Sequence, residues 1–198
     1  MTWSTLGPAA VLFGAIFTNN ILLTNFLGMC SFLAISKEVK SAVGLGAAVT
    51  FVMTMVNALE WPVYYYVLVP LNLTYLGYIV YIIIIAAAVQ LVEMIVERVS
   101  EPLYQALGIF LPLITVNCAV FGAVLFMIIR KYPFVASVAY GLGGGLGWML
   151  AIVAMAGIRQ KMAKAKVPKG LEGPGIALII TGIMALAFMG FSGMMPAS

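Results

Sequence analysis

Long runs of apolar residues dominate the chain, and short polar stretches separate them. A membrane-spanning helix needs about 20 consecutive, mostly apolar residues. One long run contains Pro70, Leu71 and Asn72, which are typical of a turn and divide that run. The charge-free runs are residues 1–36, 41–59, 61–92, 102–129, 132–158 and 173–198. The pattern therefore predicts six spans, at about 9–36, 41–60, 77–96, 103–129, 133–158 and 173–194.

Composition agrees with this pattern. Of the 198 residues, 64% are hydrophobic and 8% are charged, whereas a soluble domain carries roughly 25% charged residues. Continuous apolarity favours helices over a lipid-facing barrel, whose strands alternate between apolar and polar residues. We therefore expect an all-α integral membrane protein with one membrane domain over residues 1–198.

The basic residues predict the orientation of the chain in the membrane. Cytoplasmic loops are enriched in Lys and Arg. Only Arg130 and Lys131 follow the fourth span, while the other eight basic residues follow the first, third and fifth: Lys37, Lys40, Arg98, Arg159, Lys161, Lys164, Lys166 and Lys169. This bias places both termini outside a bacterial or archaeal cytoplasmic membrane. It also accounts for the net charge of +4 without nucleic acid as a partner.

The two halves of the chain resemble each other in layout. In each half a cysteine is followed by a basic corner, a serine and a Gly-rich helix start, at 41–49 and again at 137–147. Six spans divide into two sets of three, so two such halves would have opposite orientations in the membrane. We expect inverted repeats at about 1–100 and 101–198, an arrangement that often places a site near the midplane on broken helices.

Helix-breaking residues precede both cysteines of the chain. Gly28 lies two residues before Cys30, and Pro112 lies six residues before Cys118. Proline removes a helical hydrogen bond and clashes with the preceding turn. We expect spans 1 and 4 to be interrupted near the cysteines, although kinked, continuous helices fit these residues equally well.

The two cysteines allow two interpretations. A free cysteine commonly behaves as a small buried hydrophobe, and on chemistry alone this interpretation is favoured. The functional alternative is ligation of iron: a [2Fe–2S] cluster typically takes four Cys ligands, of which Cys30 and Cys118 would supply two. The chain contains no His, which excludes His-ligated haem and ordinary zinc catalysis within it.

Several segments together resemble one known family across nearly the whole chain. This is the family of the A subunit of Rnf complexes and of the E subunit of the sodium-translocating NADH:quinone oxidoreductase, Nqr. The short join at residues 64–78, "YYYVLVPLNLTYLGY", is more similar to the Rnf subunit. The segments are "NFLGMCSFLAISK", "VQLVEMIVERVSEPLYQALG", "LGIFLPLITVNCAVFG", "GWMLAIVAMAGIRQKM" and "VPKGLEGPGIALIITGIMALAFMGFSG".

The resemblance implies a site and its partners. It implies that Cys30 and Cys118 ligate a membrane [2Fe–2S] cluster shared with a homologous subunit of opposite topology, the Rnf E subunit, which supplies two further cysteines. It also implies assembly with the B, C, D and G subunits, and no flavin or NAD in this chain. The complex would pass electrons between reduced ferredoxin and NAD, coupled to Na⁺ or H⁺ transport.

Two other functions remain open. The Nqr counterpart would keep the same cysteine site but use NADH as donor and quinone as acceptor. A metal-free secondary transporter with inverted repeats would explain the spans and the breakers equally well. It would not explain why the only two cysteines lie at matching places.

Two further features allow more than one interpretation. Glu93 lies inside the third predicted span and is a candidate for an ion pathway, although Arg98 five residues later also suits an interfacial carboxylate. The run "GLGGGLG" at 141–147 fails the dinucleotide-binding pattern. Its two pairs of small residues four apart instead predict close helix packing.

Overall fold

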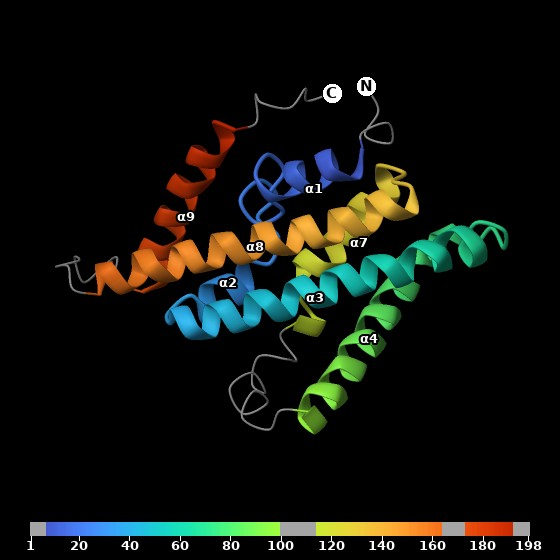
Figure 1. Cartoon of the computed structure of the whole chain (residues 1–198), viewed down its shortest axis with the longest axis horizontal. Coiled ribbons are helices and arrows are strands. Elements are labelled where there is room, and N and C mark those ends of the chain that lie inside the picture. Colours follow the sequence, from blue (N-terminus) through green and yellow to red (C-terminus); the bar gives the residue numbers. More distant parts are fainter. Residues whose placement is uncertain (1–6, 100–113, 164–172, 192–198) are drawn as a thin grey trace.

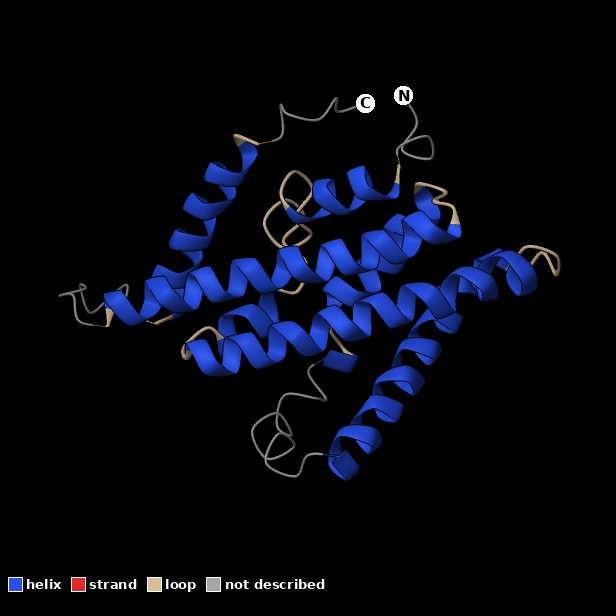
Figure 2. Cartoon of the chain, viewed as in Figure 1, coloured by secondary structure: helices blue, strands red, loops and turns tan. Residues whose placement is uncertain are grey.

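The computed structural model describes residues 7–99, 114–163 and 173–191. Its ordered elements are all helical, as predicted, with loops and turns between them (Figure 2). They are α1 (Pro8–Ile16), α2 (Met29–Ile35), α3 (Val39–Val63), η2 (Tyr64–Leu68), η3 (Thr74–Leu76), α4 (Gly77–Val99), α7 (Cys118–Ile129), α8 (Phe134–Met162) and α9 (Pro174–Met189).

The long helices α3 and α8 lie side by side at the centre of the molecule (Figure 1). A Cβ atom added at Gly46 would meet Met149, and one added at Gly145 would meet Thr50. Rising residue numbers in one helix therefore match falling numbers in the other, so the two helices are antiparallel. This pair forms the frame on which the shorter segments pack.

The glycine run of α8 serves close packing, as its spacing predicts. Added Cβ atoms at Gly141 and Gly145 would collide with α3, at 2.9 and 2.5 Å from its backbone. Those at Gly143 and Gly147 would collide with the backbone of α1, at 2.7 and 3.0 Å. Small residues let helix backbones approach closely in membranes, so α8 packs between two neighbours.

Among the described residues, three helical stretches are long and apolar enough to cross a membrane: Val39–Leu68, Thr74–Ile95 and Phe134–Met162. They correspond to the second, third and fifth predicted spans. Cys118–Ile129 and Pro174–Met189 are shorter apolar helices within the fourth and sixth spans. The arrangement of six spans in two inverted repeats stays a prediction, because residues 100–113 lie outside the described parts.

The first predicted span is not one helix. α1 ends at Ile16 and α2 begins at Met29, so the expected interruption before Cys30 is present. The fully buried side chain of Asn20 forms hydrogen bonds with backbone groups at this interruption. Its amide nitrogen donates to the carbonyls of Ile16 and Gly147, and its oxygen accepts from the amides of Leu22 and Leu23. Irregular backbone inside a membrane needs such protein partners.

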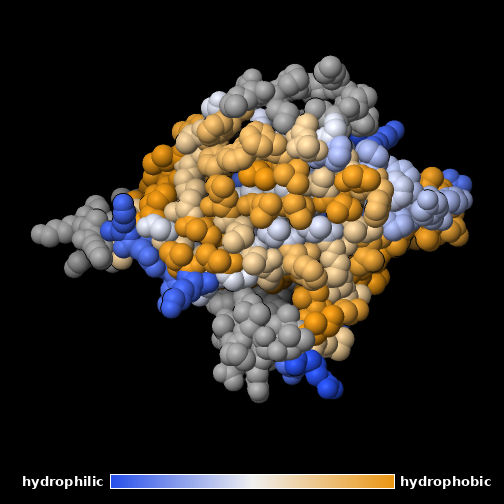
Figure 3. Space-filling view, in the orientation of Figure 1, coloured by the Kyte–Doolittle hydropathy of each residue, from blue (hydrophilic) through white to orange (hydrophobic). Residues whose placement is uncertain are grey.

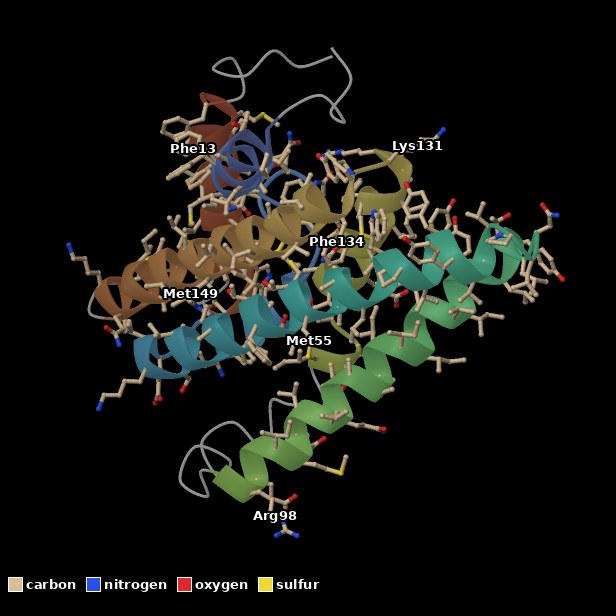
Figure 4. All side chains as sticks on the ribbon, turned by 45° about the vertical axis from the view of Figure 1, so that its right-hand side comes forward. Phe13, Met55, Arg98, Lys131, Phe134 and Met149 are labelled. Atoms are coloured by element: carbon tan, nitrogen blue, oxygen red, sulfur yellow. The ribbon has the colours of Figure 1, made fainter. Side chains whose placement is uncertain are left out.

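The surface follows the same division into apolar and polar parts. Hydrophobic residues cover most of the visible face, and hydrophilic residues gather at its edges (Figure 3). Arg98 at the end of α4 and Lys131 in the α7–α8 turn lie far apart and point away from the body (Figure 4). This distribution suits a protein whose middle faces lipid or other subunits.

Candidate functional site

The two cysteines occupy equivalent places at the starts of two short helices. Cys30 is the second residue of α2, and Cys118 is the first residue of α7. In the predicted fourth span the chain leaves the helix at Val116 and Asn117, immediately before Cys118. The expected interruption is therefore present in both spans, although Pro112 itself lies outside the described residues.

A hydrogen bond joins the two cysteine segments across the sequence. The Gly28 amide donates to the Cys118 Sγ at 2.9 Å, over a separation of 90 residues. Gly28 has a φ of 82°, a left-handed conformation that glycine adopts at little cost. An added Cβ atom there would lie 2.5 Å from the Trp148 Nε1 and 3.0 Å from the Asn117 Oδ1. Glycine is thus required both by conformation and by space.

Polar side chains hold the same junction in place. Asn117 caps α7 by accepting a hydrogen bond from the Ala119 amide, and its own amide nitrogen donates to the Ser31 hydroxyl. The Ser31 hydroxyl in turn donates to the Gly28 carbonyl. At the other end of α2, the Arg159 guanidinium donates to the Leu33 carbonyl and the Ser36 hydroxyl. Both ends of α2 are therefore anchored to α7 and α8.

The two cysteines differ in their exposure to the surroundings. Cys30 is exposed and Cys118 is partly exposed. Cys118 lines a groove of about 260 Å³ with Ile82 and Ile85 of α4. Val116, beside Cys118, is 73% exposed, and the described part of the chain brings no third Cys, His, Asp or Glu to the site. The junction can therefore offer two sulfur ligands to a group that lies at the surface of this chain.

Comparison with known proteins identifies the family. Residues 9–195 match the family described as "Rnf-Nqr subunit, membrane protein". The chain belongs to the Rnf-Nqr family of membrane subunits. This confirms the family resemblance and its extent, because the match covers nearly the entire chain.

Two groups of relatives in this family are about equally similar. The chain is 54% identical to the A subunit of the Na⁺-translocating ferredoxin:NAD⁺ oxidoreductase complex of Acetobacterium woodii, over 93% of this chain and 96% of the relative. It is 55% identical, with the same coverage, to the E subunit of the Na⁺-translocating NADH-quinone reductase of Aeromonas hydrophila and of Aeromonas salmonicida. These relatives are subunits of oxidoreductase complexes, which agrees with a role in a membrane enzyme complex. Identity alone does not separate the two groups.

Glu93 lies apart from the cysteine junction. It is partly exposed on α4, eight residues and about 12 Å along the helix from Ile85. Glu97 and Arg98, one turn later, are exposed. A role for Glu93 in an ion pathway stays a prediction.

Sequence reasoning missed Glu60. Glu60 is the last residue of the predicted span 41–60. The helical structure instead continues through η2 to Leu68, and Glu60 is fully buried. Residues 61–71, "WPVYYYVLVPL", could have indicated that the span continues beyond Glu60, because no polar residue except tyrosine interrupts this apolar run. α3 continues through Pro62.

Proposed function

We propose that Cys30 and Cys118 supply two thiolate ligands to a [2Fe–2S] cluster, with the other two from a homologous partner subunit. The observation that carries the proposal is the hydrogen bond from the Gly28 amide to the Cys118 Sγ. It holds Cys118 against the segment that carries Cys30, the other cysteine of the chain, although 87 residues separate the two in sequence.

The donor set fits such a cluster. Thiolate sulfur is the usual ligand of a [2Fe–2S] cluster, and hydrogen bonds to the sulfurs help to set its potential. The Gly28 amide already supplies one such bond, and Ser31, which accepts from Asn117, donates to the carbonyl of the same glycine. When bound, the cluster would accept and release one electron at a time. The protein's part is to hold two sulfurs at fixed positions and to donate hydrogen bonds to them.

The exposure of the site supports a shared ligand set. Four Cys ligands are needed, and this chain has two cysteines in all. Phe26 and Val116, close to the two cysteines, are 50% and 73% exposed. In the apolar stretch Thr74–Ile95, which includes most of α4, only 22% of the most apolar segment is buried within this chain. A partner subunit that covers this face would supply the missing ligands and bury these side chains together.

Among the two groups of relatives, we assign the chain to an Rnf complex. The connection between η2 and η3 contains only residues 69–73, and this short join is the feature that resembles the Rnf subunit. Through the shared cluster, the chain would pass electrons between cofactors on other subunits, along the path between reduced ferredoxin and NAD. The exchange would be coupled to Na⁺ or H⁺ movement across a cytoplasmic membrane, with both termini outside.

The experiment uses the intact complex, purified with this subunit and reconstituted in liposomes. Reduced ferredoxin and NAD⁺ are added, and NADH formation and ²²Na⁺ uptake are measured together. We expect both in the native complex and neither in a Cys30→Ala complex. The control is Thr54→Ala in α3, whose hydroxyl donates only to the Thr50 carbonyl of its own helix; it should retain both activities.

Other outcomes separate the alternatives. Activity with NADH and quinone, but not with ferredoxin, would assign the chain to the Nqr group and leave the cysteine site intact. Full ferredoxin-dependent activity in the Cys30→Ala complex would contradict the electron relay. Ion transport without any electron donor would instead favour the secondary transporter.

A further inference from the structure

Three buried polar residues lie on the paired helices α3 and α8, away from the cysteines. Asn57, Glu60 and Ser137 are all fully buried. The Asn57 Oδ1, both Glu60 carboxylate oxygens and the Ser137 Oγ have no hydrogen-bond partner among the described residues. Buried polar atoms are nearly always satisfied in proteins. Four unsatisfied oxygens in one helix interface therefore need an explanation.

The helix register brings these three residues to one layer. An added Cβ atom at Gly141 would lie 2.9 Å from the Asn57 Nδ2, so Asn57 faces Gly141. Because the helices are antiparallel, Glu60, about one turn after Asn57, lies level with Ser137, about one turn before Gly141. The Trp61 indole donates to the Tyr132 carbonyl at 2.9 Å and fixes this end of the pair. Figure 4 labels Met55 on α3 and Phe134 on α8, which lie two residues before Asn57 and three residues before Ser137 in the sequence.

The chemistry of the cluster suits a hard cation. The amide nitrogen of Asn57 is already used, because it donates to the Met53 carbonyl at 2.8 Å, which leaves its oxygen as an acceptor. A proton on Glu60 and the hydroxyl hydrogen of Ser137 would pair these oxygens with one another. A cation in the same layer would instead take them as ligands, and oxygen ligands select hard cations rather than soft metals.

The backbone that follows Glu60 is irregular, which also supports an ion site. Pro62 lies within α3 and has no N–H for the Ala58 carbonyl. A π-helical segment, Tyr64–Leu68, follows directly. Such segments inside membrane helices frequently occur at functional sites, and distorted helices that free backbone carbonyls are a recurring way to bind Na⁺.

We propose that Asn57, Glu60 and Ser137 form a sodium-binding site between α3 and α8. The single carboxylate balances the single charge of the ion, and the amide and hydroxyl oxygens complete the set within this chain. The choice of sodium rests on the proposed function as a subunit of an ion-translocating complex. The site itself rests on the four unsatisfied oxygens.

The test measures equilibrium binding of ²²Na⁺ to the intact purified complex, with choline chloride keeping ionic strength constant. Glu60→Gln keeps the shape of the side chain and removes its charge. We expect this complex to bind one Na⁺ fewer than the native complex. Ser137→Ala removes one neutral ligand, and we expect the dissociation constant of that site to rise about fivefold.

The control is Glu38→Gln, an exposed carboxylate at the other end of α3, which should leave the number of bound Na⁺ unchanged. Unchanged Na⁺ binding in both the Glu60→Gln and the Ser137→Ala complexes would overturn the sodium site and indicate a protonated carboxyl instead. The electron paramagnetic resonance (EPR) signal of the cluster is recorded on the same samples. A normal cluster signal with lost Na⁺ binding separates this site from the electron relay, whereas a missing cluster signal in the native complex would count against the proposed function alone.

Discussion

The α3–α8 pair and the α2–α7 junction use glycine for different purposes. Along α8, glycines remove side chains so that two regular helices come into backbone contact. At the junction, Gly28 adopts a left-handed conformation in an irregular segment and donates its amide to a cysteine sulfur. The comparison separates a closely packed helical frame from the irregular segment that carries Cys30.

The two regions also differ in the exposure of their side chains. Trp148 and Ala151 of α8 are fully buried, whereas Cys30 at the junction is exposed. The contacts of the frame lie within this chain, whereas the proposed cluster site would need ligands from a second subunit. Substitutions in the frame should therefore affect folding first, and substitutions at the junction should affect the bound group first.

The largest effect is expected from Gly145→Ala in the frame. Its Cβ atom would lie 2.5 Å from the Thr50 Cα, a backbone atom that can move only with the whole of α3. Overpacking of this kind costs about 3 kcal/mol. The midpoint of heat-induced aggregation of this subunit in the solubilised complex should fall by several degrees. Gly157→Ala in the same helix meets nothing within 4 Å and should not lower that midpoint. Equal behaviour of the two variants would contradict the close packing.

A smaller loss of stability, but a specific loss at the cysteines, is expected from Gly28→Ala. The left-handed conformation and the contact with the Trp148 Nε1 together cost about 2 kcal/mol. The Gly28 amide would also move away from the Cys118 Sγ, so the iron content of the complex should fall more than its thermal stability. Gly182→Ala, with no atom nearby, is the control. Normal iron content in Gly28→Ala would show that this amide does not support the site.

The smallest effect is expected from Arg159→Ala. The guanidinium donates to the Leu33 carbonyl and the Ser36 hydroxyl at the C-terminal end of α2, and its loss should cost about 1 to 2 kcal/mol. We expect faster hydrogen exchange at the backbone amides of α2, measured by mass spectrometry, while exchange along α3 is unchanged. The matched control is Lys161→Ala, an exposed residue of the same helix. Unchanged exchange in α2 would show that Arg159 does not anchor it.

The same comparison explains what the sequence could predict. The frame follows from local patterns: long apolar runs predict α3, α4 and α8, and small residues four apart predict their packing. The interruptions were expected from Gly28 and Pro112, although kinked, continuous helices fitted those residues equally well. The bond between Gly28 and Cys118 was not expected, since it joins segments 90 residues apart and depends on how the helices pack.

The burial of Glu60 is a second feature that the sequence pattern did not predict. Its charge suggested the end of a span, whereas the burial that makes it notable comes from α8, which packs against it from a distant part of the sequence. Only the antiparallel register of α3 and α8 places Ser137 level with it. Single-sequence patterns predict which residues are apolar, but not which polar residues share a buried layer.

The most direct test of the shared cluster is iron analysis and EPR spectroscopy on the reduced complex carrying Cys118→Ala. If Cys118 is a ligand, the complex should lose the signal of one [2Fe–2S] cluster and the iron that belongs to it, while Thr54→Ala retains both. The other iron–sulfur signals of the complex should be unchanged. Native iron content together with an intact membrane-cluster signal in the Cys118→Ala complex would contradict the central claim that this chain provides half of the ligand set.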